Sequence, residues 1–299
     1  MQNKVVITGG AGFIGSFLIN KIKNKKDLLV VDKIKNKKIL NKFKQLKIKY
    51  ITGDLTNKKF SKKVYKNANL VYHLAGDVKV PNTEINLNQK KEKKIFFEAI
   101  KIMENLILFC NRNTRVIFPS THLIFEKCKK NKQIFHENSK PLANLAYSRS
   151  KLKCEELLKS SGLNFSILRL GSVYGQAENK KRMFNLPNLF PLRVKNNLDL
   201  KLFSKGIQIK AIISVNDVVN AMVFLSSKKK KGLYHLVSEH LTVKKIATIC
   251  KNFNPKTNLI LTNDPIPYQG YYMNCQKIIN LGFNFSFTYK DFVKQYLFN

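Results

Sequence analysis

The sequence is short of acidic residues, of arginine and of long hydrophobic runs. Among 299 residues, 18 Asp and Glu stand against 55 Lys and Arg, which gives a formal net charge of +37. Six of the basic residues are arginine and the rest are lysine. Arginine is the residue that proteins prefer for contacts to bases and phosphates. Its scarcity therefore argues against a nucleic-acid site. We interpret the lysines as a solvated coat that follows AT-rich codon usage and steers anionic substrates.

Cysteine pairs and membrane-length segments are also missing. The five cysteines are odd in number, scattered and never spaced as C-x-x-C, which argues against a disulfide framework and against a metal site. No apolar run reaches the ~18 residues of a membrane span. Residues 4–9 read as a strand and turn, without the charged lead, hydrophobic core and small-residue cleavage site of a secretory leader. We therefore expect a cytoplasmic protein without a membrane span. Its 44% hydrophobic residues can supply a large core.

Apolar runs alternate with segments of helical spacing through the first half of the chain. This rhythm predicts an α/β fold, a Rossmann doubly wound parallel sheet. After Gly175 the rhythm becomes irregular, which indicates a smaller C-terminal α/β lobe. We assign 1–171 to cofactor binding and 172–299 to substrate binding, with 198–226 partly returning to the main sheet. The predicted strands of the sheet are 4–9, 28–32, 48–53, 69–76, 115–120 and 164–170.

The stretch "TGGAGFIG" (8–15) joins the first strand to a helix, which is the context of a dinucleotide-binding turn. Its glycines fit two spacings, Gly10-x-Gly12-x-x-Gly15 and Gly9-x-x-Gly12-x-x-Gly15, and the residues alone do not choose between them. Asp32 ends the second strand, 17 residues after Gly15. A carboxylate there accepts hydrogen bonds from ribose hydroxyls and favours NAD over NADP. Lys33 and Lys35 weaken that preference.

Two later segments extend the predicted cofactor site. Asp54 follows the third strand, near the expected adenine edge, although the same residue fits an Asx turn. "HLAG" (73–76) ends the fourth strand with small residues that leave room for a cofactor. Lys79, just beyond it, is either a contact to a cofactor phosphate or a solvated surface lysine.

Tyr147 and Lys151 lie four residues apart at the start of a predicted helix, so their side chains share one face. A phenol has a pKa near 10, so its deprotonated form needs about 4 kcal/mol of stabilisation before it can act as a base at neutral pH. An ammonium group ~6 Å away supplies roughly 2.8 kcal/mol at an effective dielectric constant of ~20. The pair therefore indicates a tyrosine that moves a proton.

These motifs resemble the extended short-chain dehydrogenase/reductase family, the NAD-dependent epimerase/dehydratase group that acts on nucleotide sugars. The resemblance rests on the glycine turn, "VYHLAG" (71–76), "FPSTHLIFE" (118–126), Tyr147-x-x-x-Lys151, "RLGSVYG" (169–175) and "VNDVVNA" (215–221). It implies the wider glycine spacing, NAD as cofactor, Thr121 as the catalytic hydroxyl beside Tyr147, and a homodimer through helices near 89–111 and 144–160. The cofactor-binding residues that follow are Gly9, Gly12, Phe13, Ile14, Gly15, Asp32, Lys33, Asp54, Leu55, Leu74, Ala75, Gly76, Tyr147 and Lys151.

The substrate side departs from the family pattern. His122 and Leu123 stand where the 4,6-dehydratases carry acid/base carboxylates, so we do not expect dehydration. His122 is either a proton carrier or a structural histidine. Ser172 replaces the common Asn of the "RxxNVYG" motif, and Lys210 replaces an Arg and can contact a diphosphate as a point charge. Thr121, His122, Ser172 and Lys210 are the expected substrate contacts.

The resemblance leaves three functions open. The first is an NAD-dependent nucleotide-sugar epimerase, or a close relative, that serves the synthesis of surface-polysaccharide precursors. The second is an NAD(P)H-dependent nucleotide-ketosugar reductase of the dTDP-4-dehydrorhamnose reductase type, which "STHLIFE" and "PLANLAYSRSKLKCEE" also resemble. The third, suggested by charge alone, is an RNA-binding member of the same fold. The Tyr147/Lys151 pair and the absence of Arg-rich stretches argue against it.

Overall fold

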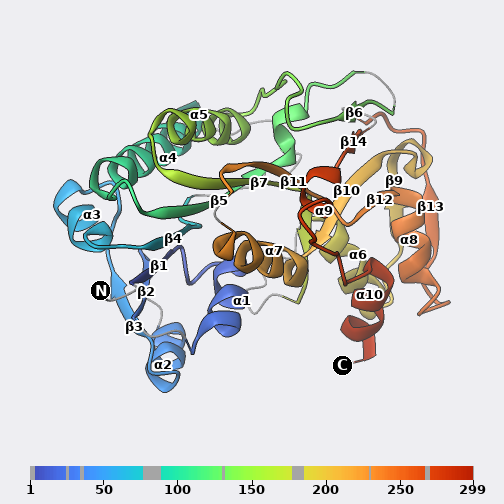
Figure 1. The fold of residues 1–299 in the computed structure, drawn as a ribbon. Helices are drawn as coiled ribbons and strands as arrows, with labels where there is room; N and C mark the ends of the chain where they lie inside the picture. The colour runs from blue at the N-terminus through green and yellow to red at the C-terminus, as the bar shows by residue number, and fades with distance from the viewer. Residues whose placement is uncertain are drawn as a thin grey trace. The chain divides into compact units, whose positions relative to one another are not determined.

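The computed structural model describes residues 4–24, 27–33, 37–76, 89–129, 132–176, 185–228, 230–266 and 270–298 (Figure 1). The chain divides into two compact units, each with its own hydrophobic core. The first consists of Met1–Ser120, Asn144–Leu168 and Ala221–Leu233, and the second of Thr121–Ala143, Arg169–Asn220 and Tyr234–Asn299.

A seven-stranded sheet, most of which belongs to the first unit, has the strand order β11-β7-β5-β4-β1-β2-β3. The pairs β1–β2, β1–β4, β2–β3 and β4–β5 are parallel. Thr8 at the end of β1 pairs with Val31 on one side and His73 on the other. The chain order reverses there, which is where doubly wound sheets bind ligands. The strands are β1 (Val5–Thr8), β2 (Leu28–Asp32), β3 (Lys49–Thr52), β4 (Leu70–His73), β5 (Arg115–Thr121), β7 (Asn164–Leu170) and β11 (Gly232–Leu236).

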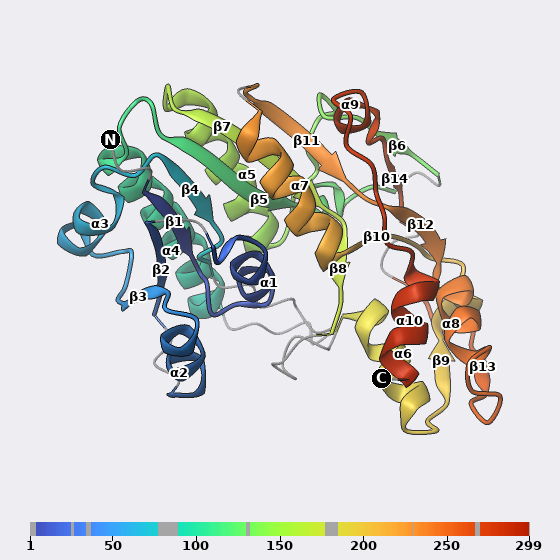
Figure 2. The ribbon, with the colours of Figure 1, turned by 60° about the horizontal axis from the view of Figure 1, so that its bottom comes forward.

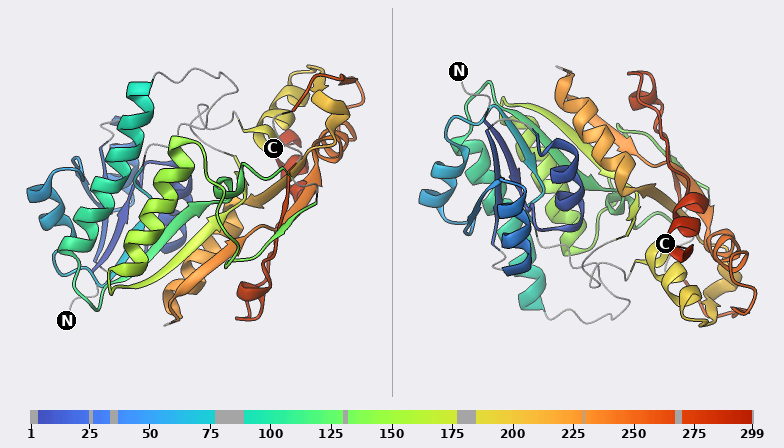
Figure 3. Two further views of the ribbon diagram at one scale, coloured as in Figure 1. Left: turned by 90° about the horizontal axis from the view of Figure 1, so that it is seen from above. Right: turned by 90° about the horizontal axis from the view of Figure 1, so that it is seen from below.

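Helices cover both faces of this sheet, which explains why strands such as "VVIT" and "LLVVD" are apolar at nearly every position. The helices α4 and α5 lie side by side on one face, and α1 lies on the other (Figure 3). In α4 the buried residues Ile95, Ile102, Met103 and Leu106 recur at helical spacing. The helices are α1 (Phe13–Ile22), α2 (Lys37–Gln45), α3 (Lys58–Tyr65), α4 (Gln89–Phe109), α5 (Ala146–Ser160) and the second half of α7 (Val215–Ser227).

The second unit is built from short strands and helices (Figure 2). Three strands form a sheet in the order β12-β10-β8, and two further pairs are β13-β9 and β14-β6. The core lies among α6, α8, α10 and this sheet, with Tyr174, Ile246 and Tyr289 fully buried. The elements are η1 (His122–Phe125), β6 (Ile134–Phe135), β8 (Ser172–Tyr174), α6 (Leu186–Lys195), β9 (Leu200–Leu202), η3 (Phe203–Gly206), β10 (Ile209–Ser214), β12 (Glu239–Thr242), α8 (Val243–Lys251), β13 (Leu259–Leu261), β14 (Tyr272–Met273), α9 (Gln276–Ile279) and α10 (Tyr289–Phe298).

The predicted α/β class and parallel sheet are confirmed, and each expected strand begins and ends within three residues of its predicted ends. The compact units, however, exchange segments across the expected boundary, because 121–143 joins the second unit and 221–233 the first. The strand that joins the main sheet from the second half is β11, whereas β9 and β10 of segment 198–226 pair elsewhere. The assignment of 1–171 to cofactor and 172–299 to substrate stays a prediction. In the described ranges, no helix is long and apolar enough to cross a membrane.

Candidate active site

The glycine turn between β1 and α1 is crowded by backbone. Gly9 has φ +70°, and a Cβ atom there would lie 2.7 Å from the carbonyl carbon of Leu74. A Cβ on Gly15 would lie 2.5 Å from the Gly9 carbonyl oxygen, which itself accepts the N–H of Gly12 at 3.0 Å. Gly10 instead faces the Val30 side chain. The backbone contacts thus connect Gly9, Gly12 and Gly15, the wider of the two spacings.

Asp32 at the end of β2 also shapes the turn. Its Oδ2 accepts the backbone N–H of Ala11 at 2.9 Å. The following helix α1 starts at Phe13 with Gly12 as its N-cap, and no side chain of the described residues caps it. A helix start of this kind offers backbone N–H groups to a phosphate. Phe13 and Ile14 are half-buried in its first turn. Lys33, exposed after β2, lies 3.5 Å from Glu98.

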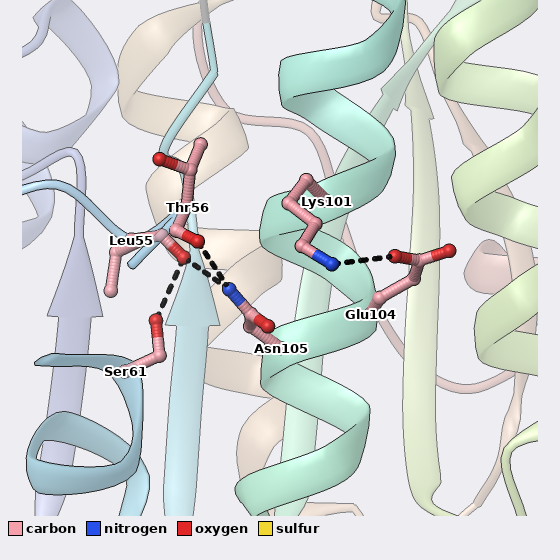
Figure 4. Close-up of polar contacts among 6 residues, drawn as sticks. All are labelled: Leu55, Thr56, Ser61, Lys101, Glu104 and Asn105. Atoms are coloured by element: carbon pink, nitrogen blue, oxygen red, sulfur yellow. Dashed lines mark hydrogen bonds and ion pairs between the residues drawn. The ribbon is translucent and has the colours of Figure 1, made fainter. Parts of the chain in front are cut away.

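The loop after β3 is fixed from two helices (Figure 4). Asn105 of α4 is buried, and its amide donates to the carbonyls of Leu55 (2.8 Å) and Thr56 (3.0 Å). Ser61 of α3 donates to the same Leu55 carbonyl at 2.7 Å. Asp54 is exposed and accepts the Thr56 N–H at 2.8 Å, so it does form an Asx turn. This turn is compatible with a cofactor contact on the exposed side.

The ends of β1 and β4 are joined by a buried polar cluster. Thr8 Oγ1 accepts the N–H of Ala75 and lies 3.1 Å from His73 Nδ1. Burial, and then the charge of Lys151, lower the pKa of His73 to about 3. His73 is therefore neutral at physiological pH. The residues after His73 become progressively more exposed. Leu74 and Ala75 are half-buried, and Gly76 is exposed with no atom within 4 Å of a Cβ position.

Tyr147 and Lys151 lie in the first two turns of α5, with Tyr147 half-buried and Lys151 buried. The Lys151 ammonium donates to the Pro119 carbonyl at 2.8 Å and lies 4.6 Å from the Phe118 ring centroid. Burial lowers its pKa from 10.5 to about 8. The carbonyl and the ring face are the kind of partners that stabilise an ammonium group away from water.

Glu155, one turn further along α5, is fully buried beside this lysine. Its Oε1 accepts the Ser120 hydroxyl at 2.5 Å, and its Oε2 lies 3.7 Å from Lys159. The nearby carboxylate raises the pKa of Lys151 against the larger effect of burial. Lys151 and Glu155 thus hold Pro119 and Ser120, near the end of β5, against α5.

The predicted substrate residues belong to the second unit. Thr121 Oγ1 accepts the N–H of Leu123 at 3.2 Å and caps η1. His122 Nδ1 lies 2.9 Å from the Tyr271 hydroxyl, and His122 Nε2 lies 3.3 Å from Ser172 Oγ. Burial, with Lys210 and His240 as lesser causes, lowers the pKa of His122 to about 3. Burial also lowers the pKa of Lys210 to about 8.

The structure thus brings the predicted cofactor residues together in one unit and His122, Ser172 and Lys210 in the other. Lys35 and Lys79 lie outside the described residues. Sequence reasoning missed Glu155, Asn105 and Tyr271. The first continues the Tyr147-x-x-x-Lys151 spacing by four residues, and the second is a polar residue within an apolar helical stripe, so both left a signal. Tyr271 left none, because its partner His122 is 149 residues away.

A parallel sheet with a crowded glycine turn at its switch point, an acid at the end of β2 and a Tyr/Lys pair on α5 defines a dinucleotide-dependent enzyme of the short-chain dehydrogenase/reductase type. The family model described as "NAD dependent epimerase/dehydratase family" matches residues 5–236. The chain belongs to that family, and NAD is its cofactor. The glycine cradle, which added Cβ atoms would fill, fits this cofactor.

Known proteins similar to the chain include epimerases. It is 23% identical to a putative UDP-glucose 4-epimerase of Methanocaldococcus jannaschii, over 97% of this chain and 96% of that protein. A UDP-glucose 4-epimerase of Thermotoga maritima, solved with UDP-glucose, has a TM-score of 0.84 and 19% identity, covering 98% of this chain and 97% of that one.

A UDP-N-acetylglucosamine 4-epimerase of Methanobrevibacter ruminantium has a TM-score of 0.85 and 18% identity, covering 99% and 97%. At these identities the two solved structures establish the fold. For several other curated relatives, the chain spans only 46–60% of their length.

Proposed function

We propose that the protein is an NAD-dependent nucleotide-sugar epimerase in which Tyr147 moves the proton. The observation that supports this most is the buried Lys151 ammonium, which lies one helical turn from Tyr147 and is held by the Pro119 carbonyl. The names of the similar proteins, which are 4-epimerases of UDP-sugars, support the substrate class.

Each residue has one task in this proposal. NAD supplies a hydride acceptor that can return the hydride. Tyr147 takes the proton of a sugar hydroxyl as the hydrogen on that carbon leaves as hydride, and returns it when hydride comes back to the opposite face of the ketone. Lys151 stabilises the tyrosinate, and Thr121 hydrogen-bonds the reacting oxygen. Asp32 binds the adenosine ribose, and the glycine turn binds the pyrophosphate.

Tyr147→Phe tests the proposal directly. We expect turnover of UDP-glucose and UDP-galactose to fall at least 100-fold, because the proton carrier is lost, while the purified variant keeps its NAD. Unchanged turnover would contradict the role of Tyr147. Loss of NAD together with turnover would instead indicate a binding role.

The alternative is a nucleotide-ketosugar reductase of the dTDP-4-dehydrorhamnose reductase type, which the stretches "STHLIFE" (120–126) and "PLANLAYSRSKLKCEE" (141–156) resemble. The two functions differ in how they use the coenzyme. An epimerase retains and recycles NAD, whereas a reductase exchanges NAD(P)H at each turnover. Denaturing the purified protein and identifying the released dinucleotide by mass and absorbance separates them. Stoichiometric NAD supports the epimerase, and an empty protein that oxidises added NAD(P)H with a ketosugar supports the reductase.

Homodimerisation through α4 and α5 stays a prediction. Phe97 and Leu108 on α4 are 64% and 60% exposed, so α4 carries apolar side chains that a partner could cover. A Phe97→Glu variant that is monomeric in light scattering, beside a dimeric parent protein, would support this interface.

A role in the synthesis of polysaccharide precursors follows from the proposed substrate class alone. Steeply salt-dependent, sub-micromolar RNA affinity would instead support the RNA-binding alternative.

A further inference from the structure

Three side chains of the second unit form a hydrogen-bonded chain that ends on a backbone carbonyl. The Tyr271 hydroxyl donates to the His122 carbonyl oxygen at 2.6 Å and lies 2.9 Å from Nδ1 of the same histidine. On the other side of the ring, Nε2 lies 3.3 Å from Ser172 Oγ. Tyr271 and His122 are buried, and Ser172 is half-buried.

Counting hydrogens assigns a direction to this chain. A tyrosine hydroxyl has one hydrogen, and Tyr271 gives it to a carbonyl that can only accept. The short contact with His122 Nδ1 is therefore a bond in which Nδ1–H donates to the phenolic oxygen. A neutral imidazole carries one N–H, so Nε2 presents a lone pair and the Ser172 hydroxyl donates to it. The only hydrogen of Ser172 is then engaged, and its oxygen has lone pairs for a further partner.

His122 keeps this neutral state between pH 6 and pH 9. Burial lowers the pKa of His122 to about 3, and the charges of Lys210 and His240 act in the same direction. No carboxylate appears among the causes of that shift. The direction of the chain is therefore the same at pH 6 and at pH 9.

We propose that Tyr271 and His122 are positioning residues that make Ser172 a hydrogen-bond acceptor, so that this site selects a ligand group with a hydroxyl or N–H donor. The ligand class rests on the proposed function, a nucleotide sugar. An Asn, which the family resemblance places at position 172, carries both a donor and an acceptor. The serine held by His122 offers an acceptor only, which narrows the ligand groups that this position binds.

The first test reads the direction of the chain without any substrate. Histidine ring-15N spectra of the NAD-loaded, full-length protein report which nitrogen carries the proton, and His122→Gln assigns the signal of His122 among the five histidines. We expect an Nδ1–H tautomer at pH 7 and at pH 9. Tyr271→Phe should shift the signal toward a mixture of tautomers, and Ser172→Ala should leave Nδ1–H in place. An Nε2–H tautomer in the parent protein would overturn the inference.

The second test measures selectivity with UDP-glucose and its four monodeoxyfluoro analogues at sugar positions 2, 3, 4 and 6. Fluorine cannot donate a hydrogen bond, so one analogue should bind the parent protein about 3- to 10-fold more weakly than UDP-glucose. In Tyr271→Phe and Ser172→Ala that analogue should bind within about twofold of UDP-glucose. Tyr272→Phe is the matched control, because Tyr272 is the neighbouring tyrosine and its ring packs at a tilt of 44° against His240. It should keep the parent selectivity.

The outcomes separate the inference from the proposed function. If Tyr271→Phe lowers the melting temperature and weakens all five ligands equally, the residue is merely structural and the inference is wrong. If the parent protein binds all five ligands equally, it is also wrong. If UDP-glucose does not bind at all, the proposed substrate class fails, and the tautomer alone then decides whether Ser172 is an acceptor.

Discussion

Lys151 should lower the stability of the protein at neutral pH and cease to do so in alkaline solution. Burial lowers its pKa from 10.5 to about 8 in the folded chain. Below pH 8 the lysine is charged in both states, and folding includes the full penalty of burying the ammonium group. Between pH 8 and 10.5 the unfolded chain binds more protons than the folded one, so the free energy of unfolding rises with pH. The difference between the two pKa values corresponds to about 3 kcal/mol.

Lys151→Met isolates this effect, because methionine fills similar space without a charge. Since the chain has no tryptophan, urea unfolding of the NAD-free protein is followed by far-UV circular dichroism at pH 7 and pH 10.5. We expect the variant to be more stable relative to the parent at pH 7 than at pH 10.5, by about 3 kcal/mol. Lys153→Met, on the same helix and half-exposed, should show no such change. A pH-independent difference for Lys151→Met would refute the reasoning.

Three further substitutions, one of them with a matched control, test the surroundings of the site. Glu155→Gln removes a charge that raises the pKa of Lys151, so the same unfolding series should show a larger pH dependence; a smaller one would contradict this. Gly9→Ala adds backbone crowding to a positive φ and should yield protein without bound NAD. Gly162→Ala, with φ +75° and nothing within 4 Å of its Cβ position, should incur only the φ strain of about 1–2 kcal/mol and keep NAD. Asn105→Ala should weaken ADP-ribose binding about tenfold in calorimetry and leave nicotinamide mononucleotide binding unchanged, because it frees the adenine-side loop; equal losses for both would contradict that.

The sheet was predictable because most of its strands are buried on both faces. A strand without a solvated side is apolar at almost every position, and "VVIT" or "RVIFPS" then stands out between helices of mixed polarity. The Tyr147/Lys151 pair was equally visible, since both residues lie on one helix and their spacing alone places them on one face. Local patterns of this kind depend on neighbours within about one helical turn.

The second unit was much less predictable, for the opposite reason. Its strands β8, β9 and β13 have three residues each, too few for a periodicity. Its segments come from three separate parts of the chain, so the contacts that define it are long-range. The same holds for His122, whose alternative roles could not be separated without knowing that Tyr271 and Ser172 occupy its two ring nitrogens.

Three histidines are buried among the described residues, His73, His122 and His235, and the first two bear on the proposed proton chemistry. His73 and His122 lie in different units, yet each is desolvated and each has a lysine, Lys151 or Lys210, that further disfavours a second proton. With pKa values of about 3, neither can donate a proton as an acid near neutral pH, whereas both can serve as fixed hydrogen-bond partners. The two lysines have pKa values of about 8, so their charges are what changes across pH 7–9. Neither His73 nor His122 is therefore suited to be the acid in the reaction, which agrees with the proposal that Tyr147, beside the charge of Lys151, carries the proton.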